Sequence, residues 1–432
     1  MSDPASVPSP ARQAVRPIRG MGRWSLVALG VNSVIGAGIY GLPGAVAESL
    51  GAYSIPAYFA AAAMVLIFGH SMALLARRTE LTGGPYVYVA AAFGPFAGFV
   101  VGWLFFLARI TALGAVTNVF VSYFARFVPQ AGSGAGRALA MIGCTAVLAS
   151  INIVGIRETA RTNNLFAVGK MVPLAVFIIA GAFFADWSRL APAFVPQPAA
   201  WGEALLLLIF AFGGFEFLTV PAEESTRPTE QVPFALIATI TCVSVIYIGI
   251  QVVTVGLGDW TAGAADPLAQ AAGRFAGAAG AAFMAAGAIV STTGTNLANI
   301  LVNSRLLYAF SRDGLIPAPL GAIHARYRTP VVAIAVVSAA GTALALSGTF
   351  AYLAALSAAV RLMMYGCCCA AALRLRPGRS GLASFALPAA GVLASVLLLA
   401  TLSLRELVIA GAAAGVGVVL HGAARRRRGT NR

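Results

Sequence analysis

Two apolar stretches of this sequence contain residues that break helices. The first reads VNSVIGAGIYGLPGAVAESLG, from Val31 to Gly51, and the second reads LLLLIFAFGGFEFLTVPAEES, from Leu205 to Ser225. Each stretch is about as long as a helix that spans a bilayer, which needs roughly 20 apolar residues. Glycine disfavours a continuous helix, and proline removes a backbone donor. Both stretches therefore predict a membrane-spanning helix that is interrupted near its middle.

Small residues have another use in membrane proteins, because they let two helices pack closely. In the first stretch, however, five glycine and proline residues fall within nine positions, and in the second Gly213 and Gly214 precede Glu216. Two interrupted helices at matching places in two halves of a chain are typical of transporters with inverted repeats. Non-helical backbone at that depth is tolerated only where it is buried or lines a cavity. The pattern therefore predicts a binding site between the two interruptions.

The composition is that of a membrane protein. Of the 432 residues, 59% are hydrophobic and 10% are charged, whereas about 25% of residues are charged in a soluble domain. The apolar runs do not alternate as the strands of a β-barrel would. They predict an all-α polytopic membrane protein with twelve transmembrane helices, of which the first and sixth are broken. The predicted spans are residues 25–49, 52–76, 88–124, 138–155, 163–185, 202–222, 234–257, 275–309, 330–347, 350–373, 384–403 and 406–421.

These spans divide the chain into five regions. Residues 1–22 are rich in proline, serine and arginine and predict a disordered cytoplasmic tail. Residues 23–185 form a first five-helix repeat, and residues 202–373 form a second, inverted repeat. Residues 384–421 are two peripheral helices, and residues 422–432 are a basic cytoplasmic tail.

The net charge of +15 does not indicate a nucleic-acid partner, because most arginines lie in short segments between apolar runs. Their alternation places both termini in the cytoplasm and the protein in the cell membrane (inner or plasma membrane), in contact with the lipid bilayer. The five cysteines lack the spacing of a zinc site. We expect neither a metal nor a cofactor.

Four stretches resemble the amino acid–polyamine–organocation (APC) superfamily of permeases. They are IGAGIYGLP (Ile35–Pro43), FAFGGFE (Phe210–Glu216), EESTRPTEQVPFA (Glu223–Ala235) and NSRLLYAFSRDGLIP (Asn303–Pro317). In the third stretch, Arg227 stands where the family usually has asparagine. The resemblance implies a LeuT-like five-plus-five inverted repeat with two peripheral helices. It also implies a secondary active transporter of amino acids that works by alternating access.

A broken helix offers free peptide N–H groups to a carboxylate and free carbonyl groups to an ammonium. These two groups suit the zwitterion of an amino acid, although other zwitterions and amines remain open. By resemblance, the residues at the substrate carboxylate are Ser33, Gly36, Ala37 and Gly38. The residues at the amine are Phe210, Ala211 and Gly213. Phe210 also lies where the family often has an aromatic gate.

Lys170, in AVGKMVPL (167–174), is the one lysine among 29 basic side chains. Some members of the superfamily place a lysine in the fifth span near the position of a sodium ion. The resemblance therefore implies proton coupling or exchange, with carbonyl groups of residues 33–35 and the hydroxyls of Ser291 and Thr292 as neighbours. A buried lysine can lose its proton, whereas arginine keeps it. The alternatives are a snorkelling lysine and a salt-bridged one.

Arg109 and Arg361 lie deep in the predicted third and tenth spans, and a charge there must be paired or hydrated. Glu216 and Glu48 are the available partners, and Glu216 could instead accept hydrogen bonds from exposed backbone N–H groups. The alternative role for the arginines is contact with a substrate side chain, which favours neutral or acidic amino acids. Tyr40 is a candidate to face the cavity.

Three other functions are weighed. A polyamine or amine transporter would need acidic side chains in the cavity, and Glu216 is the central candidate. An amino-acid sensor would share the transporter's site and bind without transport. An enzyme is not expected, because the sequence has no H-E-x-x-H motif and no P-loop.

Overall fold

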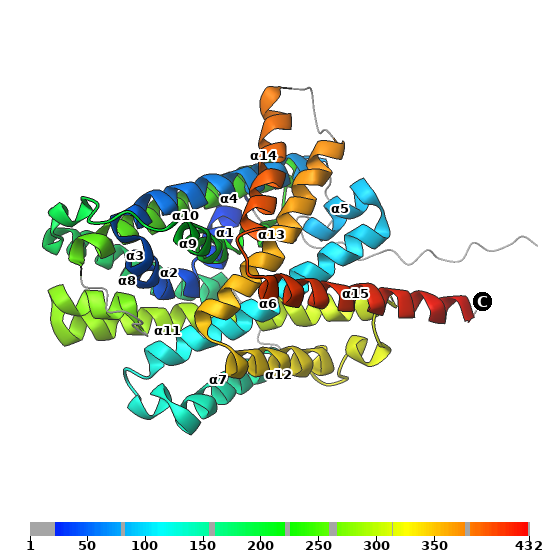
Figure 1. Cartoon of the computed structure of the whole chain (residues 1–432). Helices are drawn as coiled ribbons and strands as arrows, with labels where there is room; N and C mark the ends of the chain where they lie inside the picture. Colours follow the sequence, from blue (N-terminus) through cyan, green and yellow to red (C-terminus); the bar gives the residue numbers. More distant parts are fainter. Residues whose placement is uncertain are drawn as a thin grey trace, which may run out of the picture.

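The computed structural model describes residues 22–78, 83–154, 160–220, 225–258, 266–312, 314–375 and 381–430. Within these ranges the secondary structure is helical, as the all-α class predicts (Figure 1). Most of the predicted N-terminal tail, as well as Pro221 and Glu223, lies outside the described residues.

The helices follow one another along the chain with short connections. In order they are α1 (Arg23–Val34), α2 (Ala37–Gly41), α3 (Pro43–Leu50), α4 (Ser54–Ala76), α5 (Pro85–Phe93), α6 (Pro95–Phe124), α7 (Gly134–Val154), α8 (Ala160–Phe184), α9 (Pro198–Phe212), the 3₁₀ helix η4 (Phe215–Thr219), α10 (Pro228–Leu257), α11 (Pro267–Arg312), α12 (Val331–Ser347), α13 (Phe350–Leu375), α14 (Leu382–Leu399) and α15 (Leu404–Thr430).

The described helices include seven that are long and apolar enough to cross a membrane, or eight if the bent pair α14–α15 counts as one span. Two apolar helices, Val168–Phe184 and Val331–Ser347, are shorter. The first predicted span is divided among α1, α2 and α3, so it does not count as one long helix. The chain is therefore a multi-pass membrane protein, whereas twelve spans and the inverted repeat stay predictions.

One predicted span is not a single helix. The span at residues 88–124 consists of two helices, α5 and α6, which meet at Gly94 with φ 92° and ψ 171°. Such a φ favours glycine, and Pro95 then starts a new helix because its missing N–H is not needed there. At the C-terminal end of the chain, α15 continues to Thr430, so residues 422–430 of the predicted basic tail are helical, and their position in the cytoplasm stays a prediction.

Both predicted interruptions are present. Helix α1 ends at Val34, and Gly36 adopts φ −131° and ψ −142° before α2 begins. Helix α9 ends at Phe212, and Gly213 is extended with ψ 140°. Gly214 then has φ 128°, a value that favours glycine, before the chain enters η4. The two broken segments touch each other, since α2 and α3 contact α9, and α1 contacts η4.

The remaining helices pack around these two segments in pairs. Helix α4 lies along α10, α6 along α11, and α7 along α12 (Figure 1). Helix α6 also packs along α13. Three early helices, α4, α6 and α7, therefore lie beside the helices at the corresponding places in the second predicted repeat, whereas α8 packs on α10 and α11.

The surface of the bundle is apolar and its interior holds charges. On α8, Ile179 and Phe183 are exposed, while Lys170 on the same helix is only 2% exposed. Arg109 and Arg361 are each 4% exposed. This distribution suits a protein surrounded by hydrocarbon, because ionisable side chains then face the bundle interior.

The two broken segments approach each other closely at Gly38. A Cβ atom placed there would lie 2.5 Å from the Cα atom of Ala211, and backbone cannot easily retreat. We expect Gly38→Ala to lower stability by about 1–3 kcal/mol, the usual range for overpacking. Gly143→Ala is the matched control, because an added Cβ on this exposed face of α7 meets nothing within 4 Å. The apparent melting temperature of the purified protein should fall only for Gly38→Ala, and equal values would contradict this packing.

Candidate functional site

A cavity of about 110 Å³ lies between the two interruptions. Its wall comes from α1, α2, α6, α8, α9, α11 and α13. The predicted site residues that line it are Ser33, Gly36, Ala37, Gly38, Arg109, Lys170, Phe210, Ala211, Gly213 and Arg361. The predicted site residues buried behind the wall are Tyr40, Glu216, Ser291 and Thr292. The two interruptions and the intramembrane charges therefore meet at one place.

Lys170 caps the end of α1. Because α1 stops at Val34, its last carbonyl groups have no amide partner in the next turn. The Nζ atom of Lys170 donates to the carbonyl oxygens of Asn32 and Ile35, both at 2.9 Å. A cation at the C-terminal end of a helix also opposes the negative end of the helix dipole. Lys170 thus joins α8 to the broken end of α1.

Two other side chains complete this cap. The hydroxyl of Tyr247, on α10, donates to the carbonyl oxygen of Val34 at 3.2 Å. The hydroxyl of Ser291, on α11, donates to that of Ile35 at 3.4 Å. Thr292 donates instead within its own helix, to Ala288. Of the two predicted hydroxyl neighbours, Ser291 therefore shares a carbonyl group with Lys170 and Thr292 does not.

The contacts of Lys170 bear on its alternative roles. Its partners are backbone carbonyl groups, and within the described part of the chain no carboxylate lies within ion-pair distance of its ammonium. The side chain is also buried, so it does not extend toward the membrane surface. Behind it, Tyr40 donates to the carbonyl oxygen of Lys170 at 3.0 Å. Tyr40 thereby fixes the backbone of Lys170 from behind the cavity wall.

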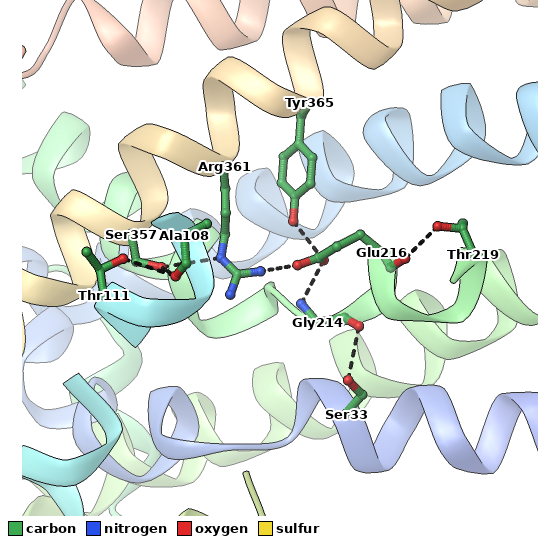
Figure 2. A network of polar contacts seen from close by, with 9 residues as sticks. All are labelled: Ser33, Ala108, Thr111, Gly214, Glu216, Thr219, Ser357, Arg361 and Tyr365. Carbon is green, nitrogen blue, oxygen red and sulfur yellow. Dashed lines mark hydrogen bonds and ion pairs between the residues drawn. The ribbon is translucent and has the colours of Figure 1, made fainter. Parts of the chain in front are cut away.

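The second interruption is organised by Glu216 (Figure 2). Arg361, on α13, donates to one carboxylate oxygen of Glu216. Tyr365, one turn further along α13, donates to the other oxygen at 3.0 Å, and the N–H of Gly214 donates to that oxygen at 2.8 Å. The two roles weighed for Glu216, pairing with an arginine and binding exposed N–H groups, are therefore combined.

This cluster joins four segments of the bundle (Figure 2). Ser33 of α1 donates to the carbonyl oxygen of Gly214 at 3.1 Å. The guanidinium of Arg361 lies over Gly213, where an added Cβ would be 2.4 Å from Nη1. Ser357, one turn before Arg361, donates to the carbonyl oxygen of Ala108 on α6 at 2.6 Å. A side chain at position 213 would push the arginine away from its carboxylate.

Arg109 has a different environment from Arg361. Its guanidinium lies 5.6 Å from the ring centre of Phe105 and 5.2 Å from that of Phe217. Among the described residues, no hydrogen-bond acceptor contacts its buried Nε. Each desolvated cation–π contact contributes up to about 2 kcal/mol, whereas burying a charge costs several kcal/mol. The two rings hold Arg109 in place without neutralising its charge. Glu48, the other carboxylate considered as a partner, is exposed at the end of α3.

An aromatic pair lies beside the cavity at Phe210. The ring of Phe210 meets that of Phe350 edge-on, with centres 5.8 Å apart. A Cβ atom at Gly41 would lie 2.6 Å from the same Phe350 ring, so α2 packs directly against it. The wall also includes Leu29 of α1 and Val302 of α11. The cavity therefore extends from the interruptions toward the N-terminal end of α1.

Some residues of the site were not expected from the sequence. Tyr365 is buried beside Glu216, and its position four residues after Arg361 places both on one helix face, which a search around Arg361 could have found. Phe217 and Asn299 line the cavity. Nothing local distinguishes Asn299 from the other asparagines of α11, because its role depends on which face of that helix meets α6.

Comparison with known proteins agrees with this class of site. A family described as "Amino acid permease" matches residues 21–416. A branched-chain amino acid permease of Bacillus subtilis is 26% identical over 336 residues, covering 73% of this chain and 72% of the relative. An uncharacterized transporter of Mycobacterium tuberculosis is 31% identical over 434 residues, covering 98% and 94%. Cationic amino acid transporter 5 of Arabidopsis thaliana is 30% identical over 241 residues, covering 52% and 42%.

The family and the names of these relatives point to a transporter rather than an enzyme. The chain belongs to the amino acid permease family, within the APC superfamily. The resemblance seen in the four sequence stretches is thereby confirmed.

The buried pair of Glu216 and Arg361 generates a prediction about stability. Removing one partner of a buried ion pair leaves an uncompensated charge and costs about 3–5 kcal/mol. We expect Glu216→Gln to lower the apparent melting temperature strongly. Glu230→Gln is the matched control, because the pair of Glu230 with Arg227 is exposed, at 3.6 Å, and such pairs contribute about 0–1 kcal/mol. If both variants melted alike, the buried pair would not have the structural role assigned to it.

Proposed function

We propose that the protein is a secondary active transporter of amino acids that works by alternating access. The observation that carries this proposal is the shared cavity of the two helix interruptions, which places free peptide groups and Lys170 around one small space. Relatives whose names state an amino-acid substrate, the branched-chain permease and the cationic transporter, support the same class of cargo. The cavity volume of about 110 Å³ suits a small metabolite.

The proposal assigns the two ends of the zwitterion to the two interruptions. The first N–H groups of α2, at Ala37 and Gly38, lack helical acceptors and would bind the α-carboxylate, with Gly36 beside them. Carbonyl groups at the end of α9 would bind the amine. The carbonyl oxygen of Ala211, 3.1 Å from the Tyr247 hydroxyl, shares the single proton of that hydroxyl with the carbonyl oxygen of Val34, and a carbonyl oxygen has a second lone pair.

The proposal includes the five-plus-five inverted repeat, with both termini in the cytoplasm. The pairwise packing of α4 with α10, α6 with α11, and α7 with α12 supports it, because these helices hold matching places in the two halves. With that orientation, the cavity extends toward the cytoplasm and Phe210 and Phe350 close its outer end. The structure then corresponds to an inward-directed state of the cycle.

Lys170 is proposed as the coupling group. As an ammonium, it holds the end of α1 against α8 through two carbonyl groups. Without its proton it has fewer donors and no charge to oppose the helix dipole, so α1 is held less firmly. A proton that enters or leaves would therefore change the relative free energies of two arrangements of α1, as coupling requires. Arginine could not perform this step, because it keeps its proton.

Two alternatives are less well supported. A polyamine has no carboxylate, and among the described residues the cavity wall offers it no acidic side chain. A sensor would bind amino acids at the same place without moving them. A measurement of flux therefore distinguishes a sensor from a transporter. The substrate profile distinguishes a polyamine transporter from an amino-acid transporter.

The first test measures flux with purified full-length protein in proteoliposomes. The probes are radiolabelled L-leucine, L-glutamate, L-glutamine, L-arginine and putrescine, each offered to vesicles preloaded with the same unlabelled compound. We expect counterflow of at least one amino acid and none of putrescine, with protein-free vesicles as the control. Binding by thermal shift without flux would identify a sensor, and putrescine flux alone would reverse the substrate assignment.

The second test concerns coupling. We expect Lys170→Ala to lower uptake driven by an imposed pH gradient by roughly 5- to 150-fold, the usual span of coupling effects. Lys170→Arg is the matched variant, because it keeps donors for the carbonyl groups of α1 but cannot release a proton. It should retain exchange at equal pH and lose gradient-driven accumulation. Full accumulation by Lys170→Ala, at equal protein in the membrane, would exclude the coupling role.

A further inference from the structure

The wall of the central cavity carries an excess of positive charge. Its basic side chains are Arg109, Lys170 and Arg361. Among the residues that the structure describes, no aspartate or glutamate lines the cavity. A zwitterion with an uncharged side chain would add no net charge to this space. The charge of the wall therefore favours a substrate that brings a further negative charge.

Two of the three cations already have partners. Arg361 is paired with Glu216, which sits behind Gly213 and Gly214 and also accepts from Tyr365. Lys170 donates to two carbonyl groups of α1, at 2.9 Å each. Both oxygens of Glu216 are engaged, one by Arg361 and the other by Tyr365 and Gly214. Neither oxygen of Glu216 is hydrogen-bonded to Arg109.

Arg109 is the cation that lacks an acceptor. It is 96% buried, and its Nε atom has no hydrogen-bond partner in the described ranges. The rings of Phe105 and Phe217 flank its guanidinium, which fixes the side chain but supplies no oxygen atom. Asn299, on α11, also lines the cavity and has a buried Nδ2 atom with no partner within the described chain. The wall therefore contains a second donor without an acceptor.

Arg109 also lies where a substrate side chain would point. It shares one face of α6 with Ala112 and Val116, at spacings of three and seven residues, and all three line the cavity. The interruptions of α1–α2 and α9 form another part of the wall. If the backbone there binds the α-carboxylate and the amine, the substrate side chain is left to α6 and α11.

We infer that the transported amino acid carries a second carboxylate, which binds the guanidinium of Arg109. This inference rests on the proposed function, since it names the substrate class of the same site. The guanidinium presents a planar set of donors that matches a carboxylate. An acidic amino acid brings one net negative charge, which offsets the unpaired arginine. A cationic side chain would meet Arg109 and is excluded by repulsion.

Two alternative roles for Arg109 predict results that differ from those of the proposed one. If Arg109 is held only by its aromatic neighbours, its removal affects folding and leaves substrate preference unchanged. If Arg109 binds the α-carboxylate, its removal weakens the binding of all amino acids alike. Only contact with the substrate side chain predicts a selective loss of acidic amino acids.

The experiment compares pairs of equal size that differ in charge. Purified full-length protein is placed in proteoliposomes. The labelled probe is the amino acid of the first test that shows counterflow. L-glutamate is compared with L-glutamine, and L-aspartate with L-asparagine, as unlabelled competitors of its uptake. We expect the native protein to prefer the acid of each pair. Arg109→Gln should weaken the binding of the acids by roughly 10- to 100-fold, as loss of a charge-assisted hydrogen bond does. The same change should leave the affinities for the amides within about threefold.

Two further variants serve as controls. Arg109→Lys keeps the charge and should keep the preference for acids at reduced affinity. This variant distinguishes an effect of the lost charge from an effect of impaired folding. Arg189→Gln removes an exposed arginine that is paired with Asp186 far from the cavity wall, and should change nothing. If Arg109→Gln does not fold, the native protein and Arg109→Lys still decide the matter.

The outcomes separate this inference from the proposed function. Transport of glutamine or leucine without preference for the acids overturns the inference and leaves the amino-acid transporter intact. An equal loss of acids and amides in Arg109→Gln also overturns it. Absence of flux for every amino acid removes the proposed function, and the inference with it.

Discussion

The structure depends on one constraint, which is that peptide groups freed inside an apolar bundle must find partners. Helix α1 stops at Val34 and helix α9 stops at Phe212, so carbonyl and N–H groups are left open at the centre of the protein. An unsatisfied backbone group in such surroundings costs several kcal/mol. Side chains from α8, α10 and α11 cap the first interruption, and a carboxylate caps the second.

The interruptions explain why charges lie inside a molecule whose surface is apolar. Lys170 is buried because the end of α1 needs a strong donor, and Glu216 is buried because the N–H of Gly214 needs an acceptor. Arg361 is buried beside Glu216 because a buried carboxylate must be paired with a cation. Arg109 does not follow from this scheme. It lies on the cavity wall beside the rings of Phe105 and Phe217.

The same contacts would connect binding with movement in the proposed transport cycle. Ser33 of α1 bonds to Gly214, and Lys170 on α8 bonds to the end of α1, so the two interruptions and a neighbouring helix meet within one network. Polar contacts across broken helices are fewer than the ladder of an intact helix, and they can be exchanged for contacts with a substrate. In the proposed transporter, a site built in this way would hold its ligand and change its own arrangement with the same groups.

The sequence by itself determined the membrane class, the family, both interruptions and most of the residues at the cavity, because hydropathy and helix-breaking residues act locally. It also marked Lys170, since a buried cation is costly wherever the chain goes. Only the tertiary structure decided which charges pair. Glu216 and Arg361 are separated by 145 positions, and nothing local chooses Arg361 over Arg109 as the partner. Likewise, the break at Gly94 needed the folded chain, since a glycine followed by proline either bends a long helix or ends it.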